Sequence, residues 1–297
     1  MLPDNTTLHP RRWLAAAALA AVLLVVTYWS AVRTTTGQRI ENAALRGADQ
    51  ATEAARIAAS DELSWITMSS FALISVVLVA AAWWRAGLRA AVGVGTVLAG
   101  STVITETLKR VLPRPELISV TGNYTHNSFP SGHTTVAMSA LFALLIVVPH
   151  RWRGIAVAVG SAYAVAIGAQ TVTAKWHRLS DTVGADLVAL AVACFVLAWL
   201  ARGGQLQTVS RRRRLRVWTI GAALAVVTGL ALAAGGIILA LAEVPTTPDP
   251  VLDDNFYLAS HSLALGCSGL AALVLWSALR QKQLGPSRRS DHPRSAA

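Results

Sequence analysis

Long apolar runs separated by short polar segments dominate the chain. Each run is about twenty residues long, which is the length that crosses the hydrocarbon core of a bilayer as a helix. Because lipid offers no hydrogen-bond partner to exposed backbone groups, these runs predict helices. The eight runs cover residues 13–32, 65–84, 90–108, 134–149, 155–174, 182–201, 217–242 and 256–279. We therefore predict an all-α fold, a polytopic transmembrane helical bundle of about eight spans, with a six-helix core and two C-terminal spans.

The composition supports a membrane protein. Only 14% of the 297 residues are charged and the mean hydropathy is +0.50, whereas a soluble domain carries about 25% charged residues. Both cysteines, Cys194 and Cys267, lie in apolar runs, so disulfide or zinc chemistry is not indicated. The net charge of +11 does not favour nucleic-acid binding, because the basic residues cluster at the ends of the spans.

The spans divide the chain into four parts. Residues 1–62 form an uncleaved N-terminal anchor followed by a polar, alanine-rich segment, whose pattern predicts a surface helix. Residues 63–201 form the core and hold all the polar motifs. Residues 202–280 contain a basic loop, with Arg211–Arg214 as a topology anchor, and two further spans. Residues 281–297 form a polar tail that we expect to be disordered.

The arginines also predict an orientation. With eight spans, Arg11, Arg85, Arg151, Arg202 and the basic residues near them fall on one side of the membrane. The positive-inside rule makes that side cytoplasmic, together with both termini. The protein is then a multi-pass protein of the plasma (inner) membrane, with its polar motifs on the extracytoplasmic face.

Three polar clusters interrupt the apolar pattern on that outer side. The central cluster is Pro130-Ser131-Gly132-His133, placed directly before a span. Ser131 is suited to cap a helix whose N-terminal amides attract an anion, and Gly132 allows a ligand to approach the backbone. His133 lies in the first turn, where it can donate a proton to the same ligand. Alone, this tetrapeptide is equally consistent with an ordinary capped helix.

The other two clusters supply cations and a second histidine. Lys109 and Arg114 follow the third span, and the chain has only three lysines among its 26 basic residues. Arg suits bidentate phosphate contacts and Lys acts as a point charge. His177 and Asp181 stand four residues apart, which places them on one helix face. A carboxylate that fixes one ring nitrogen makes the other a plausible nucleophile toward phosphorus.

The order Lys…Arg-Pro, Pro-Ser-Gly-His, His-x3-Asp resembles the type 2 phosphatidic acid phosphatase family, the lipid phosphate phosphatases of the vanadium haloperoxidase-like superfamily. The resemblance covers about residues 64–200. It implies that His133 is the general acid, that His177 is the nucleophile and that Asp181 orients His177. It further implies that Lys109, Arg114, Ser131 and Gly132 bind phosphate, and that neither a metal nor a cofactor is needed.

The motifs depart from the family pattern at two places. The spacing is Lys109-x4-Arg114, where the family usually has six intervening residues. Gln170 and Thr171 occupy the positions of the usual Ser-Arg, so one phosphate-binding arginine is missing. We expect Arg178 or Lys175 to replace it, with Arg178 favoured for its planar fork.

The resemblance leads to a functional prediction. The chain is expected to be an integral membrane phosphatase that hydrolyses a phosphomonoester or diphosphate of a lipid through a phosphohistidine. Its substrate would be polyprenyl diphosphate, phosphatidylglycerol phosphate or phosphatidate, and its partners are membrane lipids and not nucleic acid. The alternatives are a catalytically impaired lipid-phosphate-binding scaffold and a transporter. Weaker candidates are Asp186, as an intramembrane carboxylate pairing Lys175, and Tyr124, His126 and Asn127, as headgroup contacts.

Overall fold

The computed structural model describes residues 10–118, 127–209 and 215–285. In chain order, its elements are α1 (Pro10–Thr27), η1 (Tyr28–Val32), α2 (Thr35–Gly47), η2 (Ala48–Gln50), α3 (Glu53–Ser64), α4 (Met68–Ala86), α5 (Leu88–Gly95), η3 (Thr96–Gly100), α6 (Ser101–Val111), α7 (Gly132–Val147), α8 (Arg153–Thr173), α9 (Leu179–Arg202), β1 (Leu206–Thr208), α10 (Leu215–Leu241), α11 (Pro250–Ala278) and β2 (Lys282–Leu284). Arg211–Arg214, Tyr124 and His126, to which the sequence assigned roles, lie outside the described residues.

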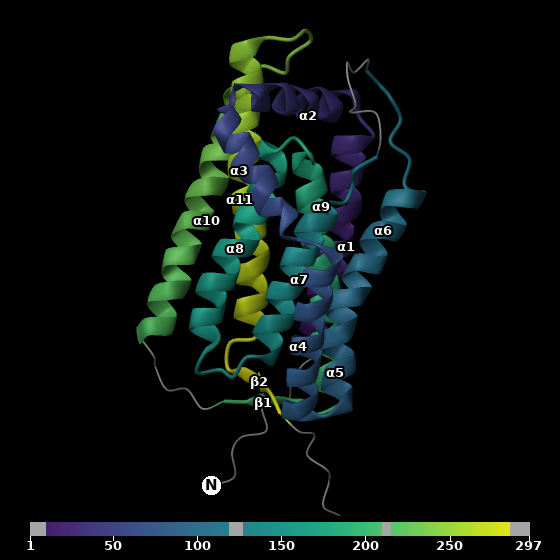
Figure 1. Ribbon diagram of the computed structural model, residues 1–297, viewed down its shortest axis with the longest axis vertical. Coiled ribbons are helices and arrows are strands. Elements are labelled where there is room, and N and C mark those ends of the chain that lie inside the picture. Colours follow the sequence, from purple (N-terminus) through teal and green to yellow (C-terminus); the bar gives the residue numbers. More distant parts are fainter. Residues whose placement is uncertain (1–9, 119–126, 210–214, 286–297) are drawn as a thin grey trace, which may run out of the picture.

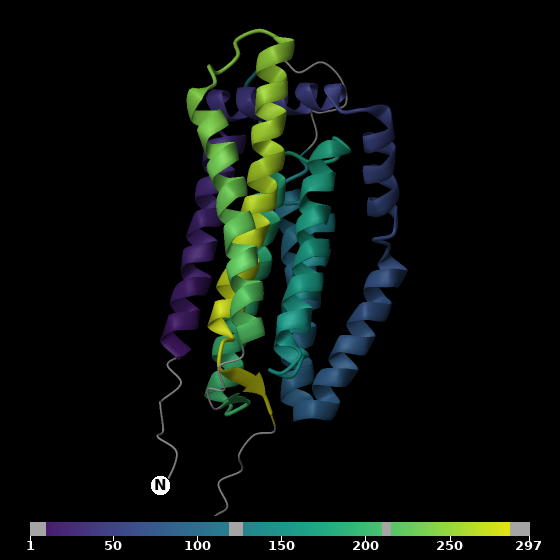
Figure 2. The same ribbon diagram turned by 90° about the vertical axis from the view of Figure 1, so that its left-hand side faces the viewer.

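The long helices form one elongated bundle (Figures 1 and 2). Within the described residues, seven helical segments are long and apolar enough to cross a membrane. The eighth predicted span is α7, an apolar helix of 16 residues. At 1.5 Å per residue it is about 24 Å long, shorter than a bilayer core of roughly 30 Å. The predicted all-α transmembrane bundle is thus confirmed, with one span shorter than a full crossing.

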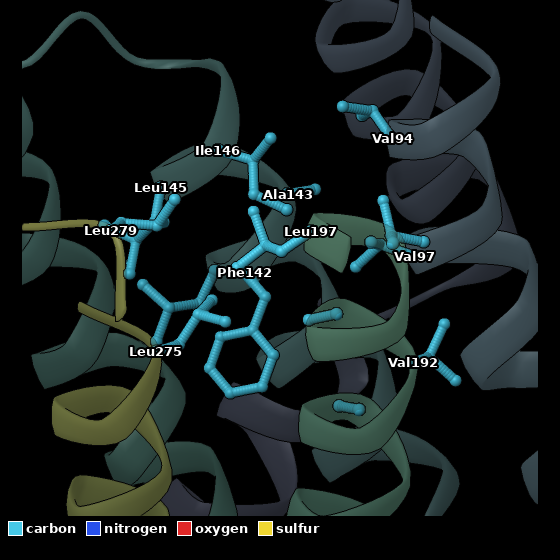
Figure 3. Packing of buried hydrophobic residues seen from close by; sticks show 14 of the residues in the cluster. Val94, Val97, Phe142, Ala143, Leu145, Ile146, Val192, Leu197, Leu275 and Leu279 are labelled. Atoms are coloured by element: carbon cyan, nitrogen blue, oxygen red, sulfur yellow. The ribbon is translucent and has the colours of Figure 1, made fainter. Parts of the chain in front are cut away.

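The core of the bundle forms around α9. In its most apolar stretch 72% of the residues are buried, against 11% in α1, α4 and α10. The outer helices instead expose large side chains such as Val76 and Leu230, as a lipid-facing surface requires. Figure 3 shows Phe142 of α7, Leu197 of α9 and Leu275 of α11 packed in this core. The central helices are therefore rigidly held, and they are the helices that carry the second and third motifs.

The segment between the first two spans covers one end of the bundle. Both views show α2 lying across the upper ends of the long helices (Figures 1 and 2). The sequence predicted a surface helix here, and α2 is indeed helical. However, one face of it is buried, including Gln38, Glu41, Asn42 and Leu45. Because α2 packs downward onto the bundle, it forms a cover over the polar motifs. We call it the cover helix.

The opposite end carries a small sheet that the sequence did not predict. Strands β1 and β2 pair antiparallel, with Leu206 opposite Leu284. The expectation of a disordered tail from residue 281 is therefore wrong for Lys282–Leu284. The buried Arg153 guanidinium donates to the carbonyl oxygens of Leu279 and Lys282 at 2.8 and 2.5 Å, which ties this strand to α8. Backbone pairing between segments that lie far apart in the chain leaves no local pattern in the sequence.

Candidate active site

The third motif forms the predicted histidine–carboxylate pair. Asp181 lies in the first turn of α9, and its Oδ2 is 3.3 Å from Nδ1 of His177. Asp181 is completely buried, and the His177 side chain is 12% exposed. With Nδ1 protonated, His177 donates to the carboxylate, and Nε2 is left with a lone pair for attack. The sequence predicted that these two residues share one face of a helix. The structure brings them into contact, but His177 precedes α9, whose N-cap is the extended residue Arg178, so the contact crosses the start of the helix.

Several further groups hold Asp181 in place. Its Oδ2 also accepts hydrogen bonds from the hydroxyl of Ser128 at 2.5 Å and the backbone N–H of Arg178 at 2.9 Å. The backbone N–H of Ser131 donates to the Asp181 carbonyl oxygen at 2.8 Å. These bonds join the second motif to the third across a long stretch of sequence. A buried carboxylate with this many donors has a fixed orientation. Ser128 was missed in the sequence because a serine in a loop carries no distinctive signal.

The second motif caps α7 as predicted. Ser131 is the N-cap residue, and its side-chain oxygen accepts the backbone N–H of Thr134 at 3.3 Å. His133 follows in the first turn, with its ring centroid 6.3 Å from that of His177 and 5.1 Å from that of Trp176. The two histidines therefore face a common space at the N-terminal end of α7. That end also carries the free amides and partial positive charge that favour an anion.

The first motif brings its lysine to the same place. A Cβ atom added at Gly132 would lie 3.4 Å from Nζ of Lys109, so the ammonium group lies beside the N-terminus of α7. Glu106 binds this ammonium at 2.9 Å. Asn127 donates to the carbonyl oxygens of Lys109 and Leu112 at 3.1 and 2.9 Å. Asn127 thus joins the first and second motifs structurally, which differs from the headgroup contact expected from the sequence.

The two arginines are buried under the cover helix. Nη2 of Arg114 donates to Oε2 of Glu41 at 2.6 Å, and Nη1 lies 3.8 Å from Oδ1 of Asp181. Arg178 is 5% exposed and donates to Oδ1 of Asn42 at 3.4 Å. Sequence reasoning missed Glu41 and Asn42, although Gln38, Glu41, Asn42 and Leu45 have the i, i+3, i+4, i+7 spacing of one helix face. That spacing was the available signal for a polar face turned inward.

Other candidates have different surroundings. Lys175 Nζ donates to Oδ1 of Asp49 at 2.6 Å, and the Asp49 side chain is exposed. The expected pairing of Asp186 with Lys175 is not observed, because Ser268 of α11 donates to the buried Asp186 carboxylate. Thr171, at the position where the resemblance led us to expect an arginine, is completely buried, and its hydroxyl donates to the Gly168 carbonyl oxygen. A charged side chain would not fit there without a buried partner.

The carboxylates near the site do not form a metal cluster. Among the residues that the structure describes, no group of three or more His, Cys, Asp or Glu side chains is placed to hold a metal ion. Asp181 and Glu41 are each bonded to a cation or to backbone amides. The arrangement instead collects positive charge, amide donors and two histidines around one space, which suits a phosphate group.

Comparisons with known proteins match the part of the chain that carries the three motifs. The family model described as the PAP2 superfamily matches residues 86–205. In structure, the chain is similar to a transmembrane PAP2-type phosphatidylglycerolphosphate phosphatase from Bacillus subtilis, with a TM-score of 0.48 and 15% sequence identity. That match covers 63% of this chain and 94% of the other. No curated protein matches the sequence.

Proposed function

We propose that the protein is an integral membrane lipid phosphatase of the PAP2 superfamily, the type 2 phosphatidic acid phosphatases, because the family model matches residues 86–205, which carry all three motifs. One observation carries the proposal. The His177–Asp181 pair, His133, Lys109 and the N-terminus of α7 converge on one space at one end of an apolar bundle. Each of these groups has a role in transferring a phosphoryl group to and from a histidine.

The proposed reaction has two steps. In the first, Nε2 of His177 attacks phosphorus, and a P–N bond forms as the bond to the leaving oxygen breaks. His133 gives its proton to that oxygen. In the second step, His133 takes a proton from water, the resulting nucleophile attacks phosphorus, and the P–N bond breaks to release phosphate. Lys109, Arg114 and the α7 amides hold the charge on the phosphoryl oxygens through both steps.

The resemblance in the motifs supports a lipid phosphomonoester or diphosphate as the substrate. Polyprenyl diphosphate, phosphatidylglycerol phosphate and phosphatidate all combine such a headgroup with an apolar tail. The positive-inside rule supports a site on the extracytoplasmic face, since Arg85, Arg151 and Arg202 lie at the opposite end of the bundle from His133. Both termini would then be cytoplasmic.

Phosphate release by purified protein in detergent micelles tests the proposal. We expect release from at least one of the three lipids, no release by His177→Ala, and inhibition by vanadate as a phosphate analogue. We also expect activity to survive EDTA, because the proposed charge stabilisation comes from side chains and amides. Binding of a lipid phosphate without any release would instead favour the scaffold alternative, and loss of activity in EDTA with recovery in Mg²⁺ would contradict the mechanism.

A further inference from the structure

The buried face of the cover helix is polar where it meets the site. Gln38, Glu41 and Asn42 lie together on this face, and each is at most 6% exposed. Gln38 donates to the Pro115 carbonyl oxygen at 2.6 Å and accepts the N–H of Leu117 at 3.3 Å. This helix therefore contacts the loop that carries Arg114. It lies outside residues 86–205, the part matched by the family model.

Glu41 uses both carboxylate oxygens within the site. Oε2 accepts from Nη2 of Arg114 at 2.6 Å, and Oε1 accepts the backbone N–H of Ser180 at 3.1 Å. The Glu41 and Arg114 side chains are each 5% exposed. Among the described residues, Nη1 of Arg114 is buried without a hydrogen-bond partner. One arm of the guanidinium is thus bonded to Glu41. The other lies 3.8 Å from Oδ1 of Asp181, beside His177, and its missing hydrogen bond is the one that a phosphate oxygen would supply.

The same helix also contacts the second arginine. Asn42, the next residue, accepts from Nη2 of Arg178. Arg178 is the cation that we expect to compensate for Thr171. One turn of the cover helix therefore contacts both guanidinium groups. Because an Arg side chain has several rotatable bonds, such fixation reduces the entropy that phosphate binding would otherwise cost.

The cover helix is in turn attached to α11, the last span. Arg46 makes two hydrogen bonds of 2.7 Å with the Asp253 carboxylate at the start of α11. Ala43 and Ala44 pack with Phe256 in a separate apolar cluster. A Cβ atom at Gly47 would lie 1.9 Å from the Asp253 carbonyl oxygen, so the two backbones are in close contact. The position of Glu41 thus depends on α11, far from the motifs in sequence.

We propose that Glu41 is a positioning residue that holds Arg114 for phosphate, and that α11 holds in place the cover helix that carries Glu41. This inference rests on the proposed function. It assigns a purpose to α11, which lies outside the family region. The opposite role would make the Glu41 carboxylate a phosphate mimic that blocks the site. The two roles predict changes of opposite sign when Glu41 is replaced.

The first experiment compares Glu41→Ala with Glu41→Gln in the phosphate-release assay. Glutamine keeps an acceptor oxygen for Arg114 or Ser180, whereas alanine removes both contacts. We expect Glu41→Ala to lower kcat/KM about tenfold or more, mainly through KM, since misplacing a binding group by about 1 Å can cost up to 10²-fold. We expect Glu41→Gln to retain activity within about threefold. The melting temperature in detergent separates misplacement from unfolding.

The second experiment tests the contact between the cover helix and α11, which lies away from the proposed phosphate site. Arg46→Ala should lower kcat/KM, and the exchange Arg46→Asp with Asp253→Arg should restore it, because the pair is re-formed with its charges reversed. Arg56→Ala is the matched control. It removes an ion pair with Asp49 at the same end of the bundle, where both side chains are more than a third exposed, and it should leave activity unchanged.

The outcomes separate this inference from the proposed function. No phosphate release by the wild-type protein would contradict the function itself. An active wild type with an equally active, folded Glu41→Ala variant would overturn the positioning role. Higher activity in both Glu41 variants would show that the carboxylate blocks the anion site. Equal losses of kcat/KM in Arg46→Ala and Arg56→Ala would refute the proposal that α11 holds the cover helix in place.

Discussion

Replacing Asp181 by asparagine tests the part of the site that the structure defines best. Three donors converge on Oδ2 of Asp181, from Ser128, the Arg178 backbone and His177, at 2.5, 2.9 and 3.3 Å. The asparagine amide has nearly the same shape as the carboxylate and keeps one acceptor oxygen. The substitution therefore removes the negative charge while largely preserving the packing. What is lost is the charge-assisted hydrogen bond that orients His177 and stabilises its positive form.

The expected loss follows from the value of that bond. A hydrogen bond to a charged group contributes about 1.5–3 kcal/mol, and each 1.36 kcal/mol corresponds to tenfold in rate. Asp181→Asn should therefore lower kcat/KM by roughly 10- to 150-fold. The assay is initial-rate phosphate release in detergent micelles with the best lipid substrate. Arg114 retains Glu41 as a partner at 2.6 Å, so we expect the protein to remain folded.

Asp186→Asn is the matched control for this variant. Asp186 is a buried carboxylic side chain further along the same helix, but its partner is the hydroxyl of Ser268. An asparagine oxygen can accept that hydroxyl, so activity should change by less than about threefold. If Asp181→Asn stays as active as the wild type, the orienting role is wrong. If both variants lose activity equally, the cause lies in the packing of α9 and not in His177.

Two further predictions concern the compensating cation and the orientation in the membrane. Arg178→Ala should lower kcat/KM by about 10²-fold, roughly 2.7 kcal/mol, because it removes one charge contact to the phosphoryl group. Lys175→Ala should have a smaller effect, since the Lys175 ammonium group already pairs with Asp49. Near-normal activity in both variants would refute the idea that these cations compensate for the missing arginine. For the orientation, a cysteine at the exposed Thr247 should react with a membrane-impermeant thiol reagent in intact cells. A cysteine at the exposed Thr208 should react only after permeabilisation, and the reverse pattern would overturn the proposed sidedness.

The predictable features of this protein depend on local sequence. Apolar runs of about twenty residues determine spans, because the bilayer requires that length and internal backbone pairing. The capped start of α7 depends on Ser131 and its neighbours, and the His177–Asp181 contact depends on a separation of four residues across the start of α9. These features were visible because all the interacting atoms lie within a few residues of one another.

The tertiary structure decided which polar groups meet across the bundle. The sequence could not show that Glu41 binds Arg114, 73 residues away, or that Arg46 binds Asp253, 207 residues away. It also could not show that Asp186 faces Ser268 and not Lys175. In each case several charged or polar partners were compatible with the pattern. The choice among them was made by how the helices pack, because a buried charge must find its partner in whichever element lies beside it.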